Sequence, residues 1–212
     1  MTKRDGLLAI WSTVASEFET DYLHWLTREH VFERVGIDGF QSGKVYRRRD
    51  SSPSEYLILY ELDDAAVMAS AAYRERLDSP TPWTQRVMPQ LQKFRRGGGT
   101  VQLRAGHDHA TGARLAVARF EGKPSALTSE LLDFVAAQDR VTQVRMMVVA
   151  SDATAIPTRE KAMRTGTEGA FGGVLAIDAL DDASAQRAVS ALRESCADCD
   201  FETYDIVFSF GS

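Results

Sequence analysis

Cysteine is scarce in this chain of 212 residues, which has only two, and no apolar run reaches the length of a membrane span. Two cysteines cannot form a disulfide framework, and a membrane-spanning helix needs about 20 apolar residues. The apolar stretch at residues 6–15 lacks a small-residue cleavage site and is soon followed by glutamate, so it is interpreted as a strand rather than a secretory leader. These absences predict a cytoplasmic protein that does not contact a membrane.

Positive charge is not in excess either, because the formal net charge is −5. An acidic chain has no overall attraction for phosphate backbones, so no nucleic-acid partner is predicted. The motifs G-x-S-x-G, the P-loop and a well-placed G-x-G-x-x-G are absent. Hydrolase, nucleoside-triphosphate and dinucleotide sites of those kinds are therefore not supported. Apolar residues make up 44% of the chain, which is enough for an ordinary globular core.

Two short patterns are typical of metal or redox sites but lack the required context. Cys196 and Cys199 form C-x-x-C after a predicted helix, whereas a reactive pair lies at a helix N-terminus. They are interpreted as two loop or surface cysteines. His107 and His109 form H-x-H without a third placed ligand, so no metal site is predicted.

The first half of the chain alternates between the periods of strands and helices. Ser16 and Glu19 form a capping box that predicts a helix from about Glu17, and Gly36 is expected to end it as a left-handed cap. Further helices are predicted around 64–77 and 83–94. Strands are predicted at 6–15, 40–49, 55–62 and 95–106. The order is β-α-β-β-α-β.

The second half repeats that order without repeating the residues. Its predicted strands are 113–122, 141–152, 169–180 and 200–210, and its predicted helices are 125–138 and 181–195. The prediction is an α+β fold of two tandem ferredoxin-like βαββαβ repeats, residues 1–105 and 113–212, joined by a connector at 106–112. Each repeat would place helices on one face of its sheet and leave the other apolar face for its partner.

The stretch HWLTREHVFERVGIDGF, residues 24–40, contains the strongest candidate site. At 100° per residue, one half of the helix surface carries Trp25, Glu29, His30, Glu33 and Arg34. His24 falls on the opposite half, so the two histidines do not converge on a metal.

Two interpretations of this helix remain open. In one, Trp25 packs on the sheet and the charged residues form rim pairs worth about 0.2–0.5 kcal/mol each. In the other, His30 projects into a cavity between helix and sheet, where an imidazole of ordinary pKa can exchange a proton near neutrality. Glu29 or Glu33 would then hold the tautomer of His30, and Arg34 would neutralise an anionic substrate.

Other residues are candidates for the wall of such a cavity. Aromatic rings with few polar groups are typical of pockets for flat ligands, although each ring taken singly could equally be core. The candidates are Trp11, Tyr46, Tyr60 and Trp83. The long connection at 152–169 is interpreted either as a solvated loop or as a functional cover whose Arg159, Lys161 and Arg164 guide an anionic ligand.

The helix motif W-x-x-x-E-H-x-x-E-R, followed by G-x-x-G-F and a Y-R strand, resembles the EthD-like branch of the dimeric α+β-barrel superfamily. The motif runs through Trp25, Glu29, His30, Glu33, Arg34, Gly36, Gly39, Phe40 and Tyr46, and residues 55–62 and 71–84 also resemble the branch. The resemblance covers roughly the first hundred residues, and the second half is similar in topology only.

The resemblance implies a barrel of two sheets, a pseudo-dimer within one chain, with a pocket between each sheet and its helices. Relatives include decarboxylases, isomerases, cyclases and oxygenases of aromatic or polyketide-like compounds, mostly without a metal, and others bind haem. Haem is disfavoured here because Val35 stands where the haem-associated motif has its first glycine. The second repeat has no histidine in its first predicted helix, so it is expected to be structural or to close the pocket.

These observations predict a protein that binds a small, mostly apolar aromatic or polyketide-like molecule. The leading hypothesis is cofactor-independent lyase or isomerase chemistry, meaning decarboxylation, isomerisation or cyclisation, with His30 as the proton shuttle assisted by Glu33 and Arg34. Trp11, Trp25, Glu29, Tyr46, Tyr60 and Trp83 would bind the ligand. The alternatives are a non-catalytic binding or stress-response module and a haem-binding relative. A homodimer is also considered.

Overall fold

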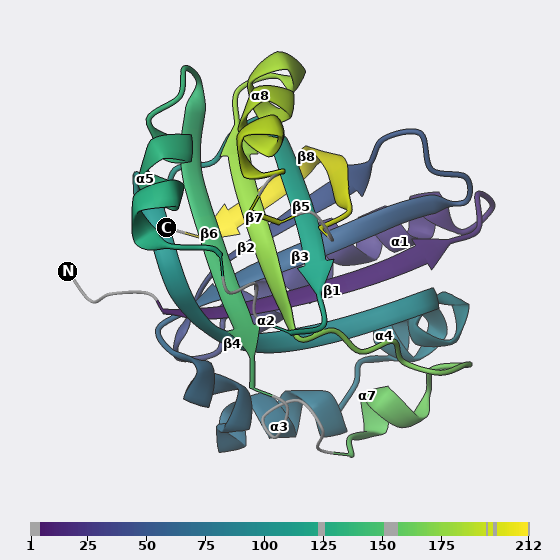
Figure 1. Cartoon of the computed structure of the whole chain (residues 1–212). Helices are drawn as coiled ribbons and strands as arrows, with labels where there is room; N and C mark the ends of the chain where they lie inside the picture. Colours follow the sequence, from purple (N-terminus) through teal and green to yellow (C-terminus); the bar gives the residue numbers. More distant parts are fainter. Residues whose placement is uncertain (1–4, 123–125, 151–156, 194, 197–198, 212) are drawn as a thin grey trace.

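Alternating apolar side chains form eight strands in the part of the chain that the computed structural model describes, residues 5–122, 126–150, 157–193, 195–196 and 199–211. The strands are β1 (Gly6–Val14), β2 (Phe40–Arg48), β3 (Ser54–Leu62), β4 (Gln92–Gly106), β5 (Arg114–Phe120), β6 (Val141–Val149), β7 (Gly173–Ala179) and β8 (Phe201–Gly211). They close into one antiparallel barrel in the order β1-β3-β2-β8-β5-β7-β6-β4 (Figure 1).

The barrel consists of two sheets with the same internal order. The first sheet runs β4-β1-β3-β2 and the second runs β8-β5-β7-β6, which is the ferredoxin-like arrangement in both cases. The sheets join where β2 pairs with β8 and where β4 pairs with β6. The edge strands of each sheet thus form backbone hydrogen bonds with the edge strands of the other sheet. Without this pairing their N–H and C=O groups would be exposed and unpaired. The predicted α+β pseudo-dimer is confirmed.

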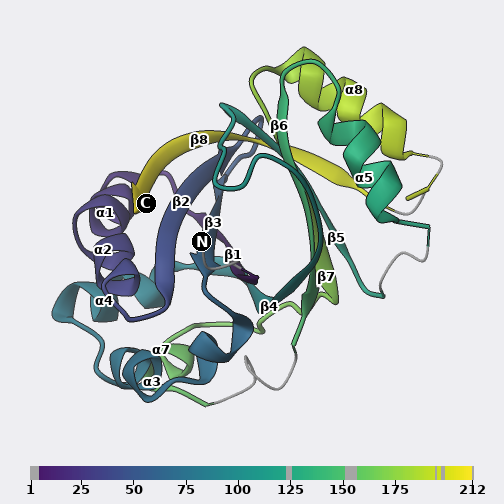
Figure 2. The same ribbon diagram turned by 90° about the vertical axis from the view of Figure 1, so that its left-hand side faces the viewer.

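Helices cover the outer face of each sheet. The first repeat carries α1 (Glu19–Trp25), the π-helical turn η1 (Leu26–His30), α2 (Val31–Val35), the 3-10 turn η2 (Ala65–Ala69), α3 (Ala71–Asp78), α4 (Pro82–Val87) and the 3-10 turn η3 (Met88–Gln90). The second repeat carries α5 (Ser129–Ala136), α7 (Arg159–Ala162) and α8 (Asp182–Leu192). Figure 2 shows α5 and α8 on the opposite side of the barrel from α1 and α2. In both views, however, α7 lies beside α3 of the first repeat.

The two-residue period of the strands divides the apolar side chains among three cores. On β1, Leu7, Ala9 and Trp11 point into the barrel, whereas Leu8 packs beneath the helices of the first repeat. The barrel interior is shared by both repeats, and the third core lies between the second sheet and α5 and α8. The large side chains of the barrel interior include Trp11, Tyr46 and Tyr204.

The first helix differs from its prediction at both ends. It begins at Glu19, and the Ser16–Glu19 capping box does not form, because the Glu19 carboxylate accepts a hydrogen bond from the Tyr56 hydroxyl at 2.5 Å. Gly36 ends α2 with φ −73°, so it is not a left-handed cap. The left-handed residue is Gly39, with φ +91°, where an added Cβ would lie 2.5 Å from the Val67 side chain.

Buried charges bridge the two sheets inside the barrel. The Arg145 guanidinium donates from Nη1 to Glu61 Oε1 and from Nη2 to Asp178 Oδ2, both at 2.8 Å. Lys44 Nζ donates to Glu61 Oε1 at 3.0 Å. Burial alone would raise the pKa of Glu61, but Arg145 and Lys44 outweigh burial and lower that pKa to about 2. Glu61 lies on the first sheet and Arg145 on the second, so their ion pair links the repeats.

The cysteines are paired rather than separate on the surface. Cys196 and Cys199 have their sulfur atoms in contact and their Cα atoms 5.2 Å apart. Both cysteines lie on the connection between α8 and β8, as the expectation of two loop or surface cysteines allows, but Cys196 is buried in the core beneath α5 and α8. Among the helices described, none combines the length and apolar character needed to cross a membrane.

Candidate functional site

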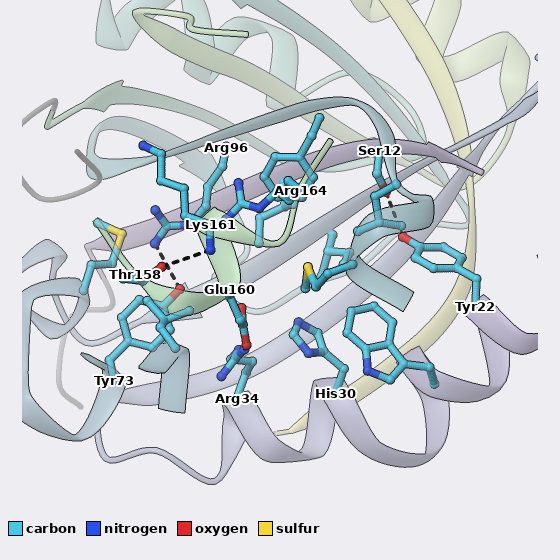
Figure 3. Close-up of a pocket in the computed structure, with 18 of the residues that line it drawn as sticks. Ser12, Tyr22, His30, Arg34, Tyr73, Arg96, Thr158, Glu160, Lys161 and Arg164 are labelled. Carbon is cyan, nitrogen blue, oxygen red and sulfur yellow. Dashed lines mark hydrogen bonds and ion pairs between the residues drawn. The ribbon is translucent and has the colours of Figure 1, made fainter. Parts of the chain in front are cut away.

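A cavity lies between the first sheet and its helices. Its volume is about 730 Å³, counted with the part that opens to solvent, and its enclosed part is narrow. Apolar side chains form much of the wall, including Ile10 of β1, Ile58 of β3 and Phe94 of β4. Trp25, His30 and Arg34 line it from the helix side. Figure 3 shows His30 and Arg34 projecting from that helix into the cavity. The inward position of His30 favours the cavity interpretation of this helix over the rim interpretation.

A π-helical turn brings His30 onto the ring of Trp25. The N–H of Val31 donates to the carbonyl of Leu26, five residues earlier, and the Thr27 hydroxyl donates to the carbonyl of Leu23 at 2.7 Å. In an ordinary α-helix, residues five apart differ by about 140° around the axis. The wider turn reduces this angle, and the ring centroids of Trp25 and His30 lie 4.1 Å apart. Turns of this kind occur often at functional sites.

The imidazole of His30 is buried and uncharged. Only 4% of the residue is exposed, and its Nδ1 has no hydrogen-bond partner among the described residues. Burial, together with the positive charge of Arg34, holds the pKa of His30 well below 6.5. The neutral ring can accept a proton, but its basicity is lower than the ordinary imidazole pKa of the prediction implies.

Neither nearby glutamate is the predicted partner of His30 Nδ1. Glu29 accepts a hydrogen bond from the Thr81 hydroxyl at 2.6 Å, next to the start of α4. Glu33 lies toward Arg34, with 4.0 Å between Oε1 and Nη1. The expectation that either holds the tautomer of His30 is therefore corrected, because the π-turn directs Trp25, His30 and Arg34 inward and leaves both glutamates at the side.

Arg34 pairs with a residue that the sequence analysis did not single out. Its Nη2 contacts Oε1 of Glu160, which lies on α7 of the second repeat. Burial works against the charge of Arg34, but the attraction of Glu160 outweighs it, and the pKa of Arg34 lies above its usual value. Nη1 of Arg34 has no hydrogen-bond acceptor in the described part of the chain. That N–H remains available to a ligand.

The second repeat closes the cavity with the segment 157–169. The Lys161 N–H donates to the Thr158 hydroxyl at 3.2 Å, which starts α7. The Thr165 hydroxyl donates to the carbonyl of Pro89 at 3.1 Å, and the Gly169 N–H donates to the carbonyl of Phe94 at 2.9 Å. These bonds tie the segment to the first repeat. Its length and basic residues were the only sequence signals of this role, and residues 152–156 of that prediction lie outside the described residues.

Basic side chains gather on the side of the cavity that faces His30. Lys161, Arg164 and Arg96 lie across the cavity from His30 and Arg34 (Figure 3). The Arg164 guanidinium carbon lies 3.9 Å from the centroid of the Phe94 ring. Burial lowers the pKa of Arg164, and the positive charge of Arg96 adds to this effect. Arg159, the third predicted anion guide, is exposed and does not line the cavity.

Of the predicted ligand-binding residues, Trp25 lines the cavity, whereas Glu29 and the four predicted wall aromatics, Trp11, Tyr46, Tyr60 and Trp83, do not. Trp11 and Tyr46 face the barrel interior, where the Trp11 indole N–H donates to the Tyr204 hydroxyl at 3.1 Å. Tyr60 lies in the core beneath the cavity against Phe40. The Trp83 indole N–H donates to Asp21 at 3.0 Å, on the outer side of α4.

Strand parity explains the displacement of Trp11. The barrel-facing positions of β1 alternate with those that face the helices, so Ile10 and Ser12 reach the cavity and Trp11 does not. The aromatic residues that do line it, besides Trp25, are Tyr22, Tyr73 and Phe94. These three were not among the predicted site residues, although all of them occur on segments predicted to be helices of the first repeat.

Haem stays an alternative that the described cavity does not establish. His30, the one histidine among its lining residues, could supply the single proximal ligand that haem iron takes in many proteins, but the ring of Trp25 and the pair of Arg34 with Glu160 narrow the interior beside it. The corresponding space in the second repeat is filled by side chains such as Leu132, Val135 and Ala188. No three His, Cys, Asp or Glu side chains gather as a metal cluster in the described ranges.

Comparison with known proteins identifies the fold. No family model and no curated protein matches the sequence. A proposed monooxygenase of Fusobacterium nucleatum has 9% sequence identity and a TM-score of 0.63, over 98% of this chain and 95% of that chain. An anthrone oxidase-like protein has 14% identity and a TM-score of 0.57, over 99% and 94%. A proposed chlorite dismutase has 12% identity and a TM-score of 0.57, over 96% and 95%.

These identities are low, so the likeness concerns the fold and not a particular activity. The EthD-like branch remains a prediction that rests on the helix motif. Together with the closed barrel of two ferredoxin-like sheets, the comparisons show that the chain has the fold of the dimeric α+β-barrel proteins, with both halves in one polypeptide.

Proposed function

We propose that the cavity beside Trp25 binds a small, mostly apolar aromatic or polyketide-like molecule and that His30 transfers a proton to and from it without a cofactor. One observation carries this proposal. The imidazole of His30 is uncharged, buried in an aromatic cavity, and has a ring nitrogen without a hydrogen-bond partner among the described residues. A proton acceptor of this kind, next to a ligand site, is suited to acid–base chemistry.

The chemistry begins with transfer of a proton from an O–H or an activated C–H of the ligand to the neutral imidazole. The ligand is left with a negative charge, which Nη1–H of Arg34, without a hydrogen-bond acceptor among the described residues, could stabilise. Return of the same proton to a different atom completes an isomerisation or a cyclisation. Return of the proton to a carbon that has lost carbon dioxide completes a decarboxylation.

The low pKa of His30 in the empty cavity is compatible with this role. Arg34 is one cause of the low pKa, because its positive charge disfavours a second positive charge nearby. A negatively charged ligand would offset that repulsion and raise the pKa of His30 toward the working pH. The base thus becomes effective when the anionic form of the ligand is present.

A second candidate function is oxidation of such a molecule by dioxygen. It is favoured by the fold neighbours described as a proposed monooxygenase and as an anthrone oxidase-like protein. The first step would be the same, since the deprotonated aromatic ligand is the species that gives electrons to dioxygen. The two candidates differ only in whether oxygen is consumed after His30 has taken the proton.

Anthrone is a suitable probe for the proton-transfer step, because it has an acidic CH2 group between aromatic rings. Deuterium uptake at this group is measured by NMR in D2O without oxygen, and oxygen consumption is measured separately in air. We expect the protein to accelerate the exchange, and His30→Gln to slow it by a factor on the order of 10² to 10⁴. His24→Gln, on the opposite face of the same helix, is the matched control and should keep the wild-type rate.

The outcomes separate the alternatives. Exchange that depends on His30 without oxygen uptake supports the lyase or isomerase function, and oxygen uptake that depends on His30 supports the oxidase. Binding of anthrone without any acceleration would favour the non-catalytic binding module. Equal exchange rates in the wild type and in His30→Gln would remove His30 from the mechanism.

A further inference from the structure

We infer that the molecule bound in this cavity carries a carboxylate and that the carboxylate is held by Arg164, with Lys161 and Arg96 adding positive charge around it. This inference rests on the proposed function, since it names the class of ligand for the same cavity. In this arrangement the segment 157–169 of the second repeat recognises the acid group of the ligand. His30 contacts the opposite end of the ligand.

The cavity wall carries more basic than acidic side chains. Five of its lining residues are basic, namely Arg34, Arg74, Arg96, Lys161 and Arg164, and one, Glu160, is acidic. That acid contacts Arg34, so its charge is already matched. Glu168 lies next to the cavity and pairs with Arg164 and Lys161. Lys161 and Arg164 thus share one carboxylate, so this part of the wall retains positive charge, although the whole chain is acidic.

Arg164 has a buried hydrogen-bond donor, Nε, without an acceptor among the described residues. Its side chain is 9% exposed, and its Nη1 pairs with Glu168 Oε2 at 3.1 Å. Nε of Arg164 is buried and finds no acceptor among the described residues. A buried N–H without an acceptor is costly, and native proteins seldom leave one unless water or a ligand supplies the acceptor. A carboxylate oxygen beside Nε would satisfy this donor.

The basic side chains of the segment 157–169 and the imidazole of His30 lie at opposite ends of the cavity. Lys161 and Arg164 face His30 and Arg34 from the other side, and apolar and aromatic side chains lie between (Figure 3). The Arg164 guanidinium carbon lies over the ring of Phe94, 3.9 Å from its centroid, so the two side chains are in contact. A flat ligand would therefore pack its rings along the apolar wall, direct its acid group to Arg164, and present its reacting atom to His30.

The chemistry of the wall favours a carboxylate over a more highly charged group. A planar guanidinium matches the two oxygens of a carboxylate through parallel hydrogen bonds. Glu168 already occupies Nη1 of Arg164, and the buried Nε without an acceptor needs only one oxygen, which a monoanionic carboxylate supplies. The ligand class is thus an aromatic or polyketide-like monocarboxylic acid.

Two probes of the same shape isolate the effect of the charge. 2-Naphthoate and 2-naphthamide share a ring system, and only the first is anionic at pH 7.5. Isothermal titration calorimetry measures the Kd of each for the full chain. We expect 2-naphthoate to bind at least about tenfold more tightly than 2-naphthamide, the factor that one charge-assisted hydrogen bond supplies.

Arg164→Gln should weaken 2-naphthoate binding by about tenfold or more and change 2-naphthamide binding by less than about twofold. The matched control is Arg159→Gln, which removes the same charge from an exposed residue of the same segment that does not line the cavity. It should leave both Kd values unchanged. If Arg159→Gln weakened 2-naphthoate binding as much as Arg164→Gln, the effect would be a general one of charge and the assignment to Arg164 would be wrong.

The inference can still be tested if Arg164→Gln does not fold. Arg164→Lys retains the charge but lacks the Nε–H, so it should keep part of the preference for 2-naphthoate. In addition, the wild type alone decides the main point. Equal binding of the two probes would overturn the carboxylate site and leave the proposed cavity function standing. If neither probe bound to the wild type, and neither bound to Trp25→Phe, the carboxylate site and the proposed cavity function would both be overturned.

Discussion

At the scale of single residues, the account depends on how burial changes the chemistry of His30. A histidine with an ordinary pKa is present in both its charged and its neutral form near neutral pH. The structure instead places the ring against Trp25 and near Arg34, and both burial and the positive charge favour the neutral form. In the proposed function, His30 is thus an uncharged acceptor for a ligand proton rather than a ring that titrates as it does in water.

The lowered pKa of His30 predicts a pH dependence of stability. In the unfolded chain the imidazole has its ordinary pKa near 6.5, so below that pH the unfolded state binds more protons than the folded state. The stability of the wild type should fall as the pH drops through 6.5, by up to about 1.4 kcal/mol per pH unit from this residue. His30→Gln should lack this component.

The measurement is urea unfolding at several pH values between 5 and 8. The difference in unfolding free energy between the wild type and His30→Gln should shrink or reverse as the pH is lowered. His24→Gln serves for comparison, because it lies on the other face of the helix. Parallel curves for the wild type and His30→Gln would show that the ring titrates as it does in water.

At the scale of secondary-structure elements, the π-turn explains why the helix presents its residues as it does. The regular 100° step placed His30 and Arg34 correctly on the inner half of the helix but placed Glu29 and Glu33 there as well. No residue between Trp25 and His30 is a proline or glycine that would signal an irregular turn. The widened turn therefore could not be predicted from periodicity, although its effect on the site is large.

Deletion of Arg28 tests the π-turn. In an ordinary α-helix a deletion rotates all later residues by about 100°, whereas in a π-turn it removes the extra residue and leaves the later residues facing as before. Arg28 is exposed within the turn. We expect the variant without Arg28 to keep 2-naphthoate binding within about threefold, on the scale of a small positional change.

Deletion of Phe32 in the regular turn of α2 provides the contrast. It should rotate Arg34 away from Glu160 and abolish binding. If the two deletions had the same effect on calorimetric binding, the π-turn would not be what positions His30.

The segment 157–169 is the second element on which the site depends. Its contact with the first repeat includes the buried pair of Glu160 with Arg34. Removing one partner of such a pair leaves an uncompensated buried charge. Glu160→Gln should therefore release the segment, so that its amide hydrogens exchange faster than in the wild type while those of the barrel strands do not.

Hydrogen–deuterium exchange with mass spectrometry checks this expectation peptide by peptide. Glu168→Gln breaks a more exposed pair and should change the exchange of residues 157–169 less. Unchanged exchange in Glu160→Gln would mean that the hydrogen bonds of Thr165 and Gly169 alone hold the segment in place.

At the scale of the whole molecule, the two repeats form one barrel and share one site. The sequence predicted the repeat order, because strand and helix periods depend on neighbouring residues. It could not predict that Glu160 meets Arg34, since that contact joins residues 126 positions apart. Nor could it decide which face of β1 borders the cavity, so Trp11 was assigned to the cavity although it lies in the barrel.

The charged link inside the barrel predicts a large effect on global stability. Arg145 bonds to Glu61 of the other sheet and to Asp178 of its own sheet, and only 2% of Arg145 is exposed. Arg145→Met leaves both carboxylates without their main partner and should lower the unfolding free energy by about 3–5 kcal/mol.

Arg140 is the comparison residue for this prediction, because its side chain is 65% exposed in its pair with Asp181. Arg140→Met should cost less than about 1 kcal/mol. Both values follow from urea unfolding at pH 7. A loss below about 1 kcal/mol for Arg145→Met would show that the two sheets do not depend on this charged link.

The measurement that tests the central claim most directly is an NMR pH titration of the His30 imidazole, in the protein alone and saturated with 2-naphthoate. The account predicts a neutral ring in the free protein, with a pKa well below 6.5, and a higher pKa when the carboxylate is bound. A pKa near 6.5 that does not respond to 2-naphthoate would contradict it, because His30 would then be neither shielded by the cavity nor next to the ligand.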